Sequence, residues 1–394
     1  MQILRGIRFL FSNVVLFLIF MILILVMATC KDAVRSLKNE YSGNIPDANP
    51  LEYAKGFRIQ YLSDSRLITI LNPWQGAKNV SYKYIISSKK PDNPELTKLV
   101  WIKKPVQRII CLSTTQIGMI EFVDGLESIV GISGVQYVCN SHLQKKIAEG
   151  RIVDVGYDVS LNYELIYSLK PDLVLIYGVN SEASSLYDRL NSYGIPALFI
   201  GEYLEPNPLA KAEWVKLIAC LFDKDSIVNL QYTQITADYR ALKKLTSNVS
   251  YYPVIMTGLP WKEAWNIPGG DSFTAQLIMD AGGKYLWAGR KTRDNIPMNL
   301  EQAVNDAKNV DIWINAGIAR SLADINATDE RLSRLRPILN DKVFNNNKII
   351  CPGGGNAYWE SGVVHPELIL RDLVMIFHPE LNLNKEFTYY RKLE

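Results

Sequence analysis

The stretch SLNYELIYSLKPDLVLIYG (160–178) contains the pattern that decides the fold class. Apolar residues first recur at helical spacing, Pro171 then ends the helix, and a continuous apolar run follows from Leu173 to Tyr177. A short apolar run without polar alternation is typical of a strand buried on both faces of a parallel sheet. The segment LYDRLNSYGIPALFIG (186–201) repeats this order of helix, stop and strand. The repeat predicts an α/β fold with a mostly parallel sheet.

The rest of the chain shows the same alternation in two blocks. Residues 105–222 and residues 248–394 both alternate helical patterns with short apolar runs. Between them, residues 226–245 contain no Gly or Pro and predict one helix, about 30 Å long. We therefore predict two doubly wound α/β lobes, 105–222 and 248–394, joined by a single long rigid helix within 223–247. Such a helix implies little hinge movement between the lobes.

Two further segments precede the first lobe. Residues 51–104 contain the strand-like runs FRIQYL, RLITIL and YKYIIS, separated by turn residues, so we expect a small N-terminal β-hairpin extension. Residues 30–50 are polar and rich in turn formers without an apolar period, which predicts a tether.

The N-terminal segment is typical of an export signal. Arg5 and Arg8 precede an apolar core at 14–27, and small residues follow it, directly before Cys30. This order resembles a bacterial lipoprotein box, in which Cys30 is lipidated and becomes the mature N-terminus. An uncleaved anchor helix from Leu10 to Met27 is the alternative. In both cases we expect the body of the protein in the periplasm, anchored to a membrane.

Composition and motifs exclude several functions. A net charge of +3 over 394 residues offers nothing to suggest nucleic-acid binding. No GxSxG or HExxH motif occurs, so we expect neither catalysis nor a cofactor. The cysteines after the signal are far apart and form no Cys/His cluster, so we expect no metal site. Export permits disulfides, but four cysteines allow three pairings and the sequence selects none. We expect buried free thiols at Cys111, Cys139, Cys220 and Cys351.

Four phrases in the two lobes carry a family resemblance. They are RIICLSTTQIGMIEFVDGLESIVGIS (108–133), LNYELIYSLKPDLVLIYG (161–178), IPGGDSFTAQLIMDAGG (267–283) and VHPELILRDL (364–373). Through them the chain from about Gln107 to Leu381 resembles the periplasmic substrate-binding proteins of ABC importers for iron chelates, haem and cobalamin, the class with a helical backbone between its lobes. The resemblance implies a ligand held in the cleft between the lobes, and it leaves the hairpin extension outside the common core.

The resemblance also implies that each lobe carries an exposed carboxylate that docks onto arginines of the permease dimer. The matching residues are Glu164 in NYE (162–164) and Asp271 in GGDS (269–272), where the family more often has Glu. A local role is the alternative, because Asp271 suits an N-cap and Glu164 gains from the helix dipole. The presence of an acidic residue at corresponding places in both lobes favours docking.

We expect ligand contacts in the loops at the carboxyl ends of the strands, where open α/β sheets place their sites. Aromatic side chains in such loops suit a large planar ligand, and arginines pair with the carboxylates of a chelate or a haem propionate. A core position is the alternative for any single aromatic residue. The candidates in the first lobe are Thr114, Tyr137, Tyr157, Tyr177 and Tyr203. Those in the second lobe are Trp261, Trp265, Trp287, Arg290, Arg293, Tyr358 and Trp359.

The glycines of PGGGN (352–356) lack the Lys-Ser/Thr partner of a phosphate loop, so we expect them to admit a bulky ligand or to relieve turn strain.

The predicted function is that of a monomeric, lipid-anchored receptor for a ferric-siderophore or cobalamin-type metal chelate. Its predicted partner is an ABC permease in the inner membrane. Haem is the third candidate ligand. The competing class is an exported two-lobed α/β enzyme that acts on a chelate or cofactor.

Overall fold

The computed structural model describes residues 51–394 except 158, 159 and 263. The predicted export signal, the lipidation site Cys30 and the predicted tether lie outside the described residues. Leu51–Gln60 and Asp64–Glu394 form one unit, which contains both lobes. Within the described part of the chain, no helix has both the length and the apolar character needed to cross a membrane.

The first lobe is built around a five-stranded parallel sheet in the order β7-β6-β5-β8-β9. Its strands are β5 (Ile109–Cys111), β6 (Ile129–Ile132), β7 (Val153–Asp154), β8 (Leu173–Ile176) and β9 (Ala197–Phe199). Its helices are α2 (Thr114–Phe122), α3 (Ser141–Ala148), α4 (Tyr163–Ser168), α5 (Glu182–Ser192), α6 (Pro208–Glu213) and α7 (Val215–Phe222). Every residue of β5, β8 and β9 is buried, which explains their continuous apolar runs.

The second lobe contains a five-stranded sheet in the order β12-β10-β14-β15-β16, in which only the β15–β16 pair is antiparallel. The strands β11 and β13 form a separate antiparallel pair. The strands are β10 (Val254–Thr257), β11 (Ala264–Pro268), β12 (Lys284–Tyr285), β13 (Asn295–Asn299), β14 (Ile312–Ile314), β15 (Val343–Asn345) and β16 (Arg391–Lys392). The helices are α9 (Phe273–Asp280), α10 (Leu300–Asp306), α11 (Leu322–Thr328), α12 (Arg336–Leu339), α13 (Ala357–Glu360) and α14 (Pro366–Phe377). The predicted α/β fold class is confirmed.

The N-terminal extension is a four-stranded sheet in the order β1-β2-β3-β4. Its strands are β1 (Phe57–Tyr61), β2 (Ser65–Leu71), β3 (Ser81–Ser87) and β4 (Val100–Lys103). The expected hairpin corresponds to β2 and β3, which pair in antiparallel register, whereas β4 pairs with β3 in parallel and was not predicted. Ile68, Ile70 and Ile86 belong to the same buried cluster as the strands of the first lobe, so this sheet and the first lobe share a core.

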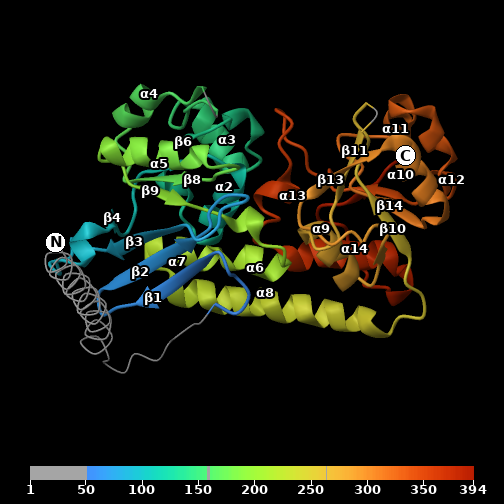
Figure 1. The fold of residues 1–394 in the computed structure, drawn as a ribbon, viewed down its shortest axis with the longest axis horizontal. Helices are drawn as coiled ribbons and strands as arrows, with labels where there is room; N and C mark the ends of the chain where they lie inside the picture. Colours follow the sequence, from blue (N-terminus) through green and yellow to red (C-terminus); the bar gives the residue numbers. More distant parts are fainter. Residues whose placement is uncertain (1–50, 158–159, 263) are drawn as a thin grey trace, which may run out of the picture. The chain divides into compact units, whose positions relative to one another are not determined.

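The long helix α8 (Asp225–Leu245) has 21 residues and packs against α6, α7 and α14 (Figure 1). Its buried residues include Val228, Tyr232 and Tyr239, which recur at the helical spacing that places them on one face. Val228 and Tyr232 belong to the core of the first lobe, and Tyr239 belongs to the core of the second. The Tyr239 hydroxyl also donates to Asp280 at the end of α9, over 2.8 Å. One helix therefore contributes to both hydrophobic cores.

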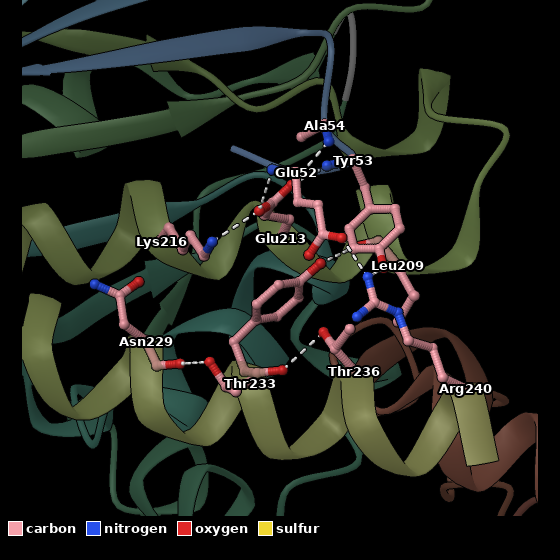
Figure 2. Close-up of polar contacts among 11 residues, drawn as sticks. Glu52, Tyr53, Ala54, Leu209, Glu213, Lys216, Asn229, Thr233, Thr236 and Arg240 are labelled. Carbon is pink, nitrogen blue, oxygen red and sulfur yellow. Dashed lines mark hydrogen bonds and ion pairs between the residues drawn. The ribbon is translucent and has the colours of Figure 1, made fainter. Parts of the chain in front are cut away.

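A buried carboxylate holds the segment before β1 on the helices (Figure 2). Glu213, at the end of α6, is 0% exposed. Its two oxygens accept hydrogen bonds from the amides of Glu52, Tyr53 and Ala54, over 3.0, 2.8 and 2.8 Å. The ammonium of Lys216 lies 2.7 Å from the same carboxylate and balances its charge. Three amides that would otherwise lack partners are thus satisfied by one side chain.

We predict that Glu213→Gln lowers the free energy of unfolding by roughly 3–5 kcal/mol, because it leaves the buried Lys216 ammonium without its counter-charge. The shift of the urea midpoint measures the loss. The control is Glu52→Gln, which removes an exposed ion pair with Arg240 and is expected to cost less than about 1 kcal/mol. Equal midpoints for the two variants would contradict the role given to Glu213.

Candidate functional site

The first candidate site lies at the carboxyl ends of the strands in the first lobe. From β5 the sheet continues through β6 to β7 on one side and through β8 to β9 on the other, so the strand order reverses at β5. Open α/β sheets place ligands at such a point. A cavity of about 570 Å³ is found here, and its lining includes Leu112, Ser133, Tyr177, Gly178, Glu182 and Arg189. At one wall the Arg189 guanidinium lies over the Tyr163 ring, 3.7 Å from its centroid. Of the predicted ligand residues, Tyr177 lines this cavity.

A second and larger cavity, of about 740 Å³, is lined by three parts of the chain. The N-terminal extension supplies Lys55, Trp74 and Gln75, the first lobe supplies Tyr203 and Glu205, and the second lobe supplies Arg293, Asp294 and Asn295. Tyr203 and Arg293 were predicted as ligand residues. The residues from the extension were missed, because their sequence carries no signal that links them to loops more than a hundred residues away.

The two cavities meet at Gly178. Gly178 lines the first cavity, and its carbonyl accepts a hydrogen bond from the Tyr203 hydroxyl, which lines the second. Trp74 forms a β-bridge with Gly178 from the side of the extension. Burial raises the pKa of Tyr203 to about 12, so its hydroxyl remains a neutral donor at physiological pH. The side chains of Trp74 and Tyr203, together with Gly178, therefore lie where the two cavities meet.

A disulfide joins the two lobes at another place, which corrects the expectation of four free thiols. Cys139 follows the strand β6 in the first lobe, and Cys351 follows β15 in the second. The two are bonded, with their Cα atoms 5.2 Å apart. Cys111 and Cys220 are free and buried, as expected. The sequence separation of 212 residues between the bonded cysteines explains why spacing alone did not select this pair.

The glycines of PGGGN also serve this contact between the lobes. A Cβ atom on Gly353 would lie 2.0 Å from the Gln136 carbonyl oxygen, and one on Gly355 would lie 1.8 Å from that of Tyr137. Only residues without a side chain fit here. The expectation that these glycines admit a ligand is wrong for Gly353 and Gly355, because they admit the backbone of the first lobe. Gly354, with a φ of 92°, fits the alternative of relieving turn strain.

Glu360, in α13, adds hydrogen bonds at the same place. Its carboxylate accepts from the amides of Cys139 and Asn140, each over 2.7 Å, although the side chain is only 3% exposed. Burial raises the pKa of Glu360 to about 7, while the two amide hydrogen bonds lower it. A Cβ atom on Gly118 of α2 would lie 2.0 Å from the Glu360 carbonyl oxygen, so α2 and α13 are in direct backbone contact.

A buried pair of opposite charges lies between the lobes as well. Glu202, in the turn after β9, and Lys211, in α6, are 3% and 8% exposed. Burial raises the pKa of Glu202 and lowers the pKa of Lys211, and the attraction between the two charges opposes both shifts. The Lys211 ammonium lies 4.7 Å from the ring centroid of Phe273, at the start of α9. This cation–π contact connects α6 to the second lobe.

The predicted ligand residues outside the two cavities fall into two groups. Tyr137, Tyr157, Trp261 and Trp359 are 43%, 50%, 69% and 47% exposed. Arg290 is also exposed, and Thr114 is half-buried at the start of α2. These six lie in or next to loops but line neither of the two large cavities. Their role in binding stays a prediction.

Three of the predicted ligand residues lie in the core instead. Trp265 is 0% exposed, its ring packs 5.5 Å from that of Trp313, and its indole N–H donates to the Thr257 carbonyl. Trp287 and Tyr358 are 4% and 2% exposed. Ligand contact by these three side chains is therefore a wrong prediction, because their rings fill the interior of the second lobe.

The two predicted docking carboxylates are exposed, and neither caps its helix. Asn162 is the N-cap of α4, which leaves Glu164 free in the first turn. Ser272 is the N-cap of α9, so the alternative role of Asp271 as a cap is wrong. The Asp271 carboxylate lies 3.6 Å from the Lys291 ammonium, in an exposed ion pair that contributes little stability. Both side chains are accessible to a partner.

Potential metal ligands are not gathered at either cavity. Within the described residues, no group of three or more His, Cys, Asp or Glu side chains could hold a metal ion. The polar groups at the cavities are amides, hydroxyls, cations, the carboxylate of Glu182 at the smaller cavity and two carboxylates at the larger one. The described groups are suited to hydrogen bonding and charge pairing.

Comparison with known sequences identifies a family and two relatives. The sequence model of the family described as periplasmic binding protein matches residues 109–345. One uncharacterized lipoprotein of Methanocaldococcus jannaschii is 23% identical over 365 residues, which cover 87% of this chain and 85% of the relative. A second uncharacterized lipoprotein of that organism is 24% identical over 362 residues, which cover 88% of this chain and 87% of the relative.

Solved structures share the fold at low sequence identity. The Helicobacter pylori protein Ceue with Ni(II) bound superposes with a TM-score of 0.55 at 17% identity and covers 72% of this chain and 88% of its own. The periplasmic vitamin B12 binding protein of Vibrio cholerae gives 0.52 at 13% identity, with 70% and 98% covered. An ABC transporter substrate-binding protein of Listeria monocytogenes gives 0.51 at 14% identity, with 69% and 99% covered. These identities establish a common fold and no more.

We predict that replacing Cys139 and Cys351 together by Ser lowers the free energy of unfolding by roughly 2–4 kcal/mol, because the bond closes a loop of 212 residues. Thermal unfolding measures the loss. Reductant should lower the midpoint of the wild-type protein to that of the double variant and leave the double variant unchanged. A Cys111→Ala variant keeps the disulfide and should stay sensitive to reductant. Reductant-independent unfolding of the wild type would contradict the assignment.

Proposed function

Because the chain belongs to the periplasmic binding protein family, we propose that it is the solute-binding component of an ABC importer. In this role it captures a metal chelate at the carboxyl ends of its strands and delivers it to the permease. It performs no chemistry on the cargo.

The observation that carries this proposal is the pair of cavities that meet at Gly178. Both lie at loops that follow strands of the first sheet, and the larger one also includes Arg293 of the second lobe. Volumes of about 570 and 740 Å³ are within the usual range for small-molecule sites. A ligand held in the larger cavity would contact both lobes.

The proposed cargo is a ferric-siderophore or cobalamin-type chelate, with haem as the third candidate. Support comes from the exposed aromatic side chains Tyr137, Trp261 and Trp359, which suit a large ligand with planar groups. Support also comes from the structural neighbours, because one is a vitamin B12 binding protein and another was solved with Ni(II) bound.

The proposed location is the periplasm, with the chain anchored through a lipid on Cys30. The order of basic residues, apolar core and Cys30 supports export and lipidation. The two relatives named as lipoproteins support the same assignment.

The proposed contacts with the permease are the carboxylates of Glu164 and Asp271. One lies in the first lobe and the other in the second, each near the start of a helix, and both are exposed. A pair of carboxylates in separate lobes can pair with two arginines of a permease dimer, and such bidentate pairs fix orientation as well as affinity.

We predict that the full-length protein in detergent binds one class among ferric siderophores, corrinoids and haemin with saturable, sub-micromolar affinity. Quenching of Trp fluorescence and isothermal titration calorimetry measure the binding. The cargo should be recovered chemically unaltered after long incubation. Lack of binding to all three classes, or turnover of one of them, would overturn the proposed function.

We predict that reversing both docking carboxylates, Glu164→Lys with Asp271→Lys, abolishes uptake of the bound class by cells and leaves its affinity for the purified protein unchanged. Opposed charges at the permease surface would prevent productive docking. The matched control, Asp238→Lys with Glu386→Lys, makes the same charge change at exposed sites elsewhere and should preserve uptake. Normal uptake by the first variant would exclude a docking role.

A further inference from the structure

The larger cavity contains a wall that belongs to neither lobe. The end of β2 contributes Leu71, and the connection between β2 and β3 contributes Asn72 and residues 74–77. The segment before β1 contributes Lys55 and Gly56. The rest of the lining is formed by residues 203–205 of the first lobe and 293–295 of the second. The N-terminal extension is therefore part of the cavity itself.

The β2–β3 connection is held in place by both lobes. The Gln75 side-chain amide donates to Asp294 of the second lobe over 2.7 Å. Trp74 forms a β-bridge with Gly178 of the first lobe, and its ring lies 5.8 Å from that of Phe199. Asn72 closes the base of the connection through hydrogen bonds with Val80 over 2.8 and 3.1 Å. The wall is thus positioned by specific contacts on each side.

Lys55 is fixed at the backbone, which leaves its ammonium group available to a ligand. The amides of Lys55 and Gly56 both donate to one oxygen of Glu205, each over 2.8 Å. The same oxygen accepts from the Trp214 indole over 3.3 Å, and Glu205 is only 5% exposed. The Glu205 carboxylate is therefore used to hold the backbone of this segment.

The carboxylates and the cations that line the larger cavity differ in whether they have partners within the described residues. The two carboxylates, Glu205 and Asp294, already accept hydrogen bonds from the protein. The two cations are Lys55, from the segment before β1, and Arg293, from the second lobe. Throughout the described residues, neither the Lys55 ammonium nor the Arg293 guanidinium has a hydrogen bond or an ion pair. Such cations are suited to an anionic ligand, and the planar guanidinium pairs bidentately with a carboxylate.

We infer that the larger cavity binds the cargo through carboxylate groups, with Arg293 of the second lobe and Lys55 of the N-terminal extension pairing with them and the β2–β3 connection acting as a specificity element. The rings of Trp74 and Tyr203 supply the apolar surface beside these charges. The cargo is then a carboxylate-bearing chelate rather than a neutral one. This inference rests on the proposed function, since it names the chemical class of the solute and the wall that selects it.

The test compares three chelates with the full-length protein in detergent by isothermal titration calorimetry. Ferric citrate carries free carboxylates, whereas ferrioxamine B binds its iron through hydroxamates, and cyanocobalamin has no carboxylate. The expected order of affinity places ferric citrate first. Raising the NaCl concentration should weaken the binding of ferric citrate, because salt screens its pairing with the two partly exposed cations.

Variants then assign the binding to the two cations. Arg293→Gln should weaken the binding of ferric citrate about tenfold or more, and the double variant with Lys55→Gln about a hundredfold, as expected for hydrogen bonds between charged groups. Trp74→Ala should also weaken binding, because it removes the apolar surface beside the two cations, and it should lower the thermal midpoint, because the ring packs against Phe199. The matched control is Lys78→Gln, which removes an exposed cation from the same connection outside the cavity and should have no effect.

The outcomes separate this inference from the proposed function. Unchanged binding of ferric citrate by the Lys55/Arg293 double variant overturns the inference alone. Tighter binding of ferrioxamine B or cyanocobalamin than of ferric citrate also overturns the inference and supports the receptor. Lack of binding to every chelate overturns the proposed function itself. A fall in affinity confined to the cavity variants, with Lys78→Gln unchanged, supports the inference.

Discussion

The buried carboxylate of Glu213 is the interaction on which the arrangement of the candidate site depends (Figure 2). It satisfies three consecutive amides before β1 and is balanced by Lys216, so it fixes where the chain enters the fold. Glu205 then fixes the next two amides in the same way. Two acids from one stretch of the first lobe thus hold five consecutive residues of backbone. β1 and the rest of the extension follow directly in the chain. This attachment therefore also determines that residues of the extension line the larger cavity.

The lobes are connected at several separate places, and the kind of interaction differs from one place to the next. The helix α8 contributes side chains to both hydrophobic cores. The Cys139–Cys351 bond and the hydrogen bonds of Glu360 join the loops after β6 and β15. On another side, Gln75 joins the extension to Asp294. A large hinge movement would have to break several of these links at once. Little closure upon binding therefore stays a prediction.

The sequence-based predictions were accurate where the interactions involve residues close in the sequence, and less accurate where they involve distant residues. Stretch 160–178 predicted α4 and β8 because Pro171 and the apolar run act on adjacent residues. Trp265, Trp287 and Tyr358 were placed in the site, yet they fill the core, because a large ring after a strand is equally suited to either environment. Asp271 was considered as a cap, but the neighbouring Ser272 takes that position. The exact residue at which the helix begins therefore decides whether Asp271 is a cap or an exposed charge.

The sequence by itself determined the α/β class, the long helix α8, the separation of an N-terminal strand region and the family resemblance, since each of these is encoded in local periodicity and in the order of motifs. Only the tertiary structure decided that Cys139 pairs with Cys351 and that the PGGGN glycines meet the first lobe. It also decided that Lys55, Tyr203 and Arg293 line one cavity. The physical reason is that these groups are brought together by packing between segments far apart in the sequence, and neither hydrophobic spacing nor local propensity specifies which of them become neighbours.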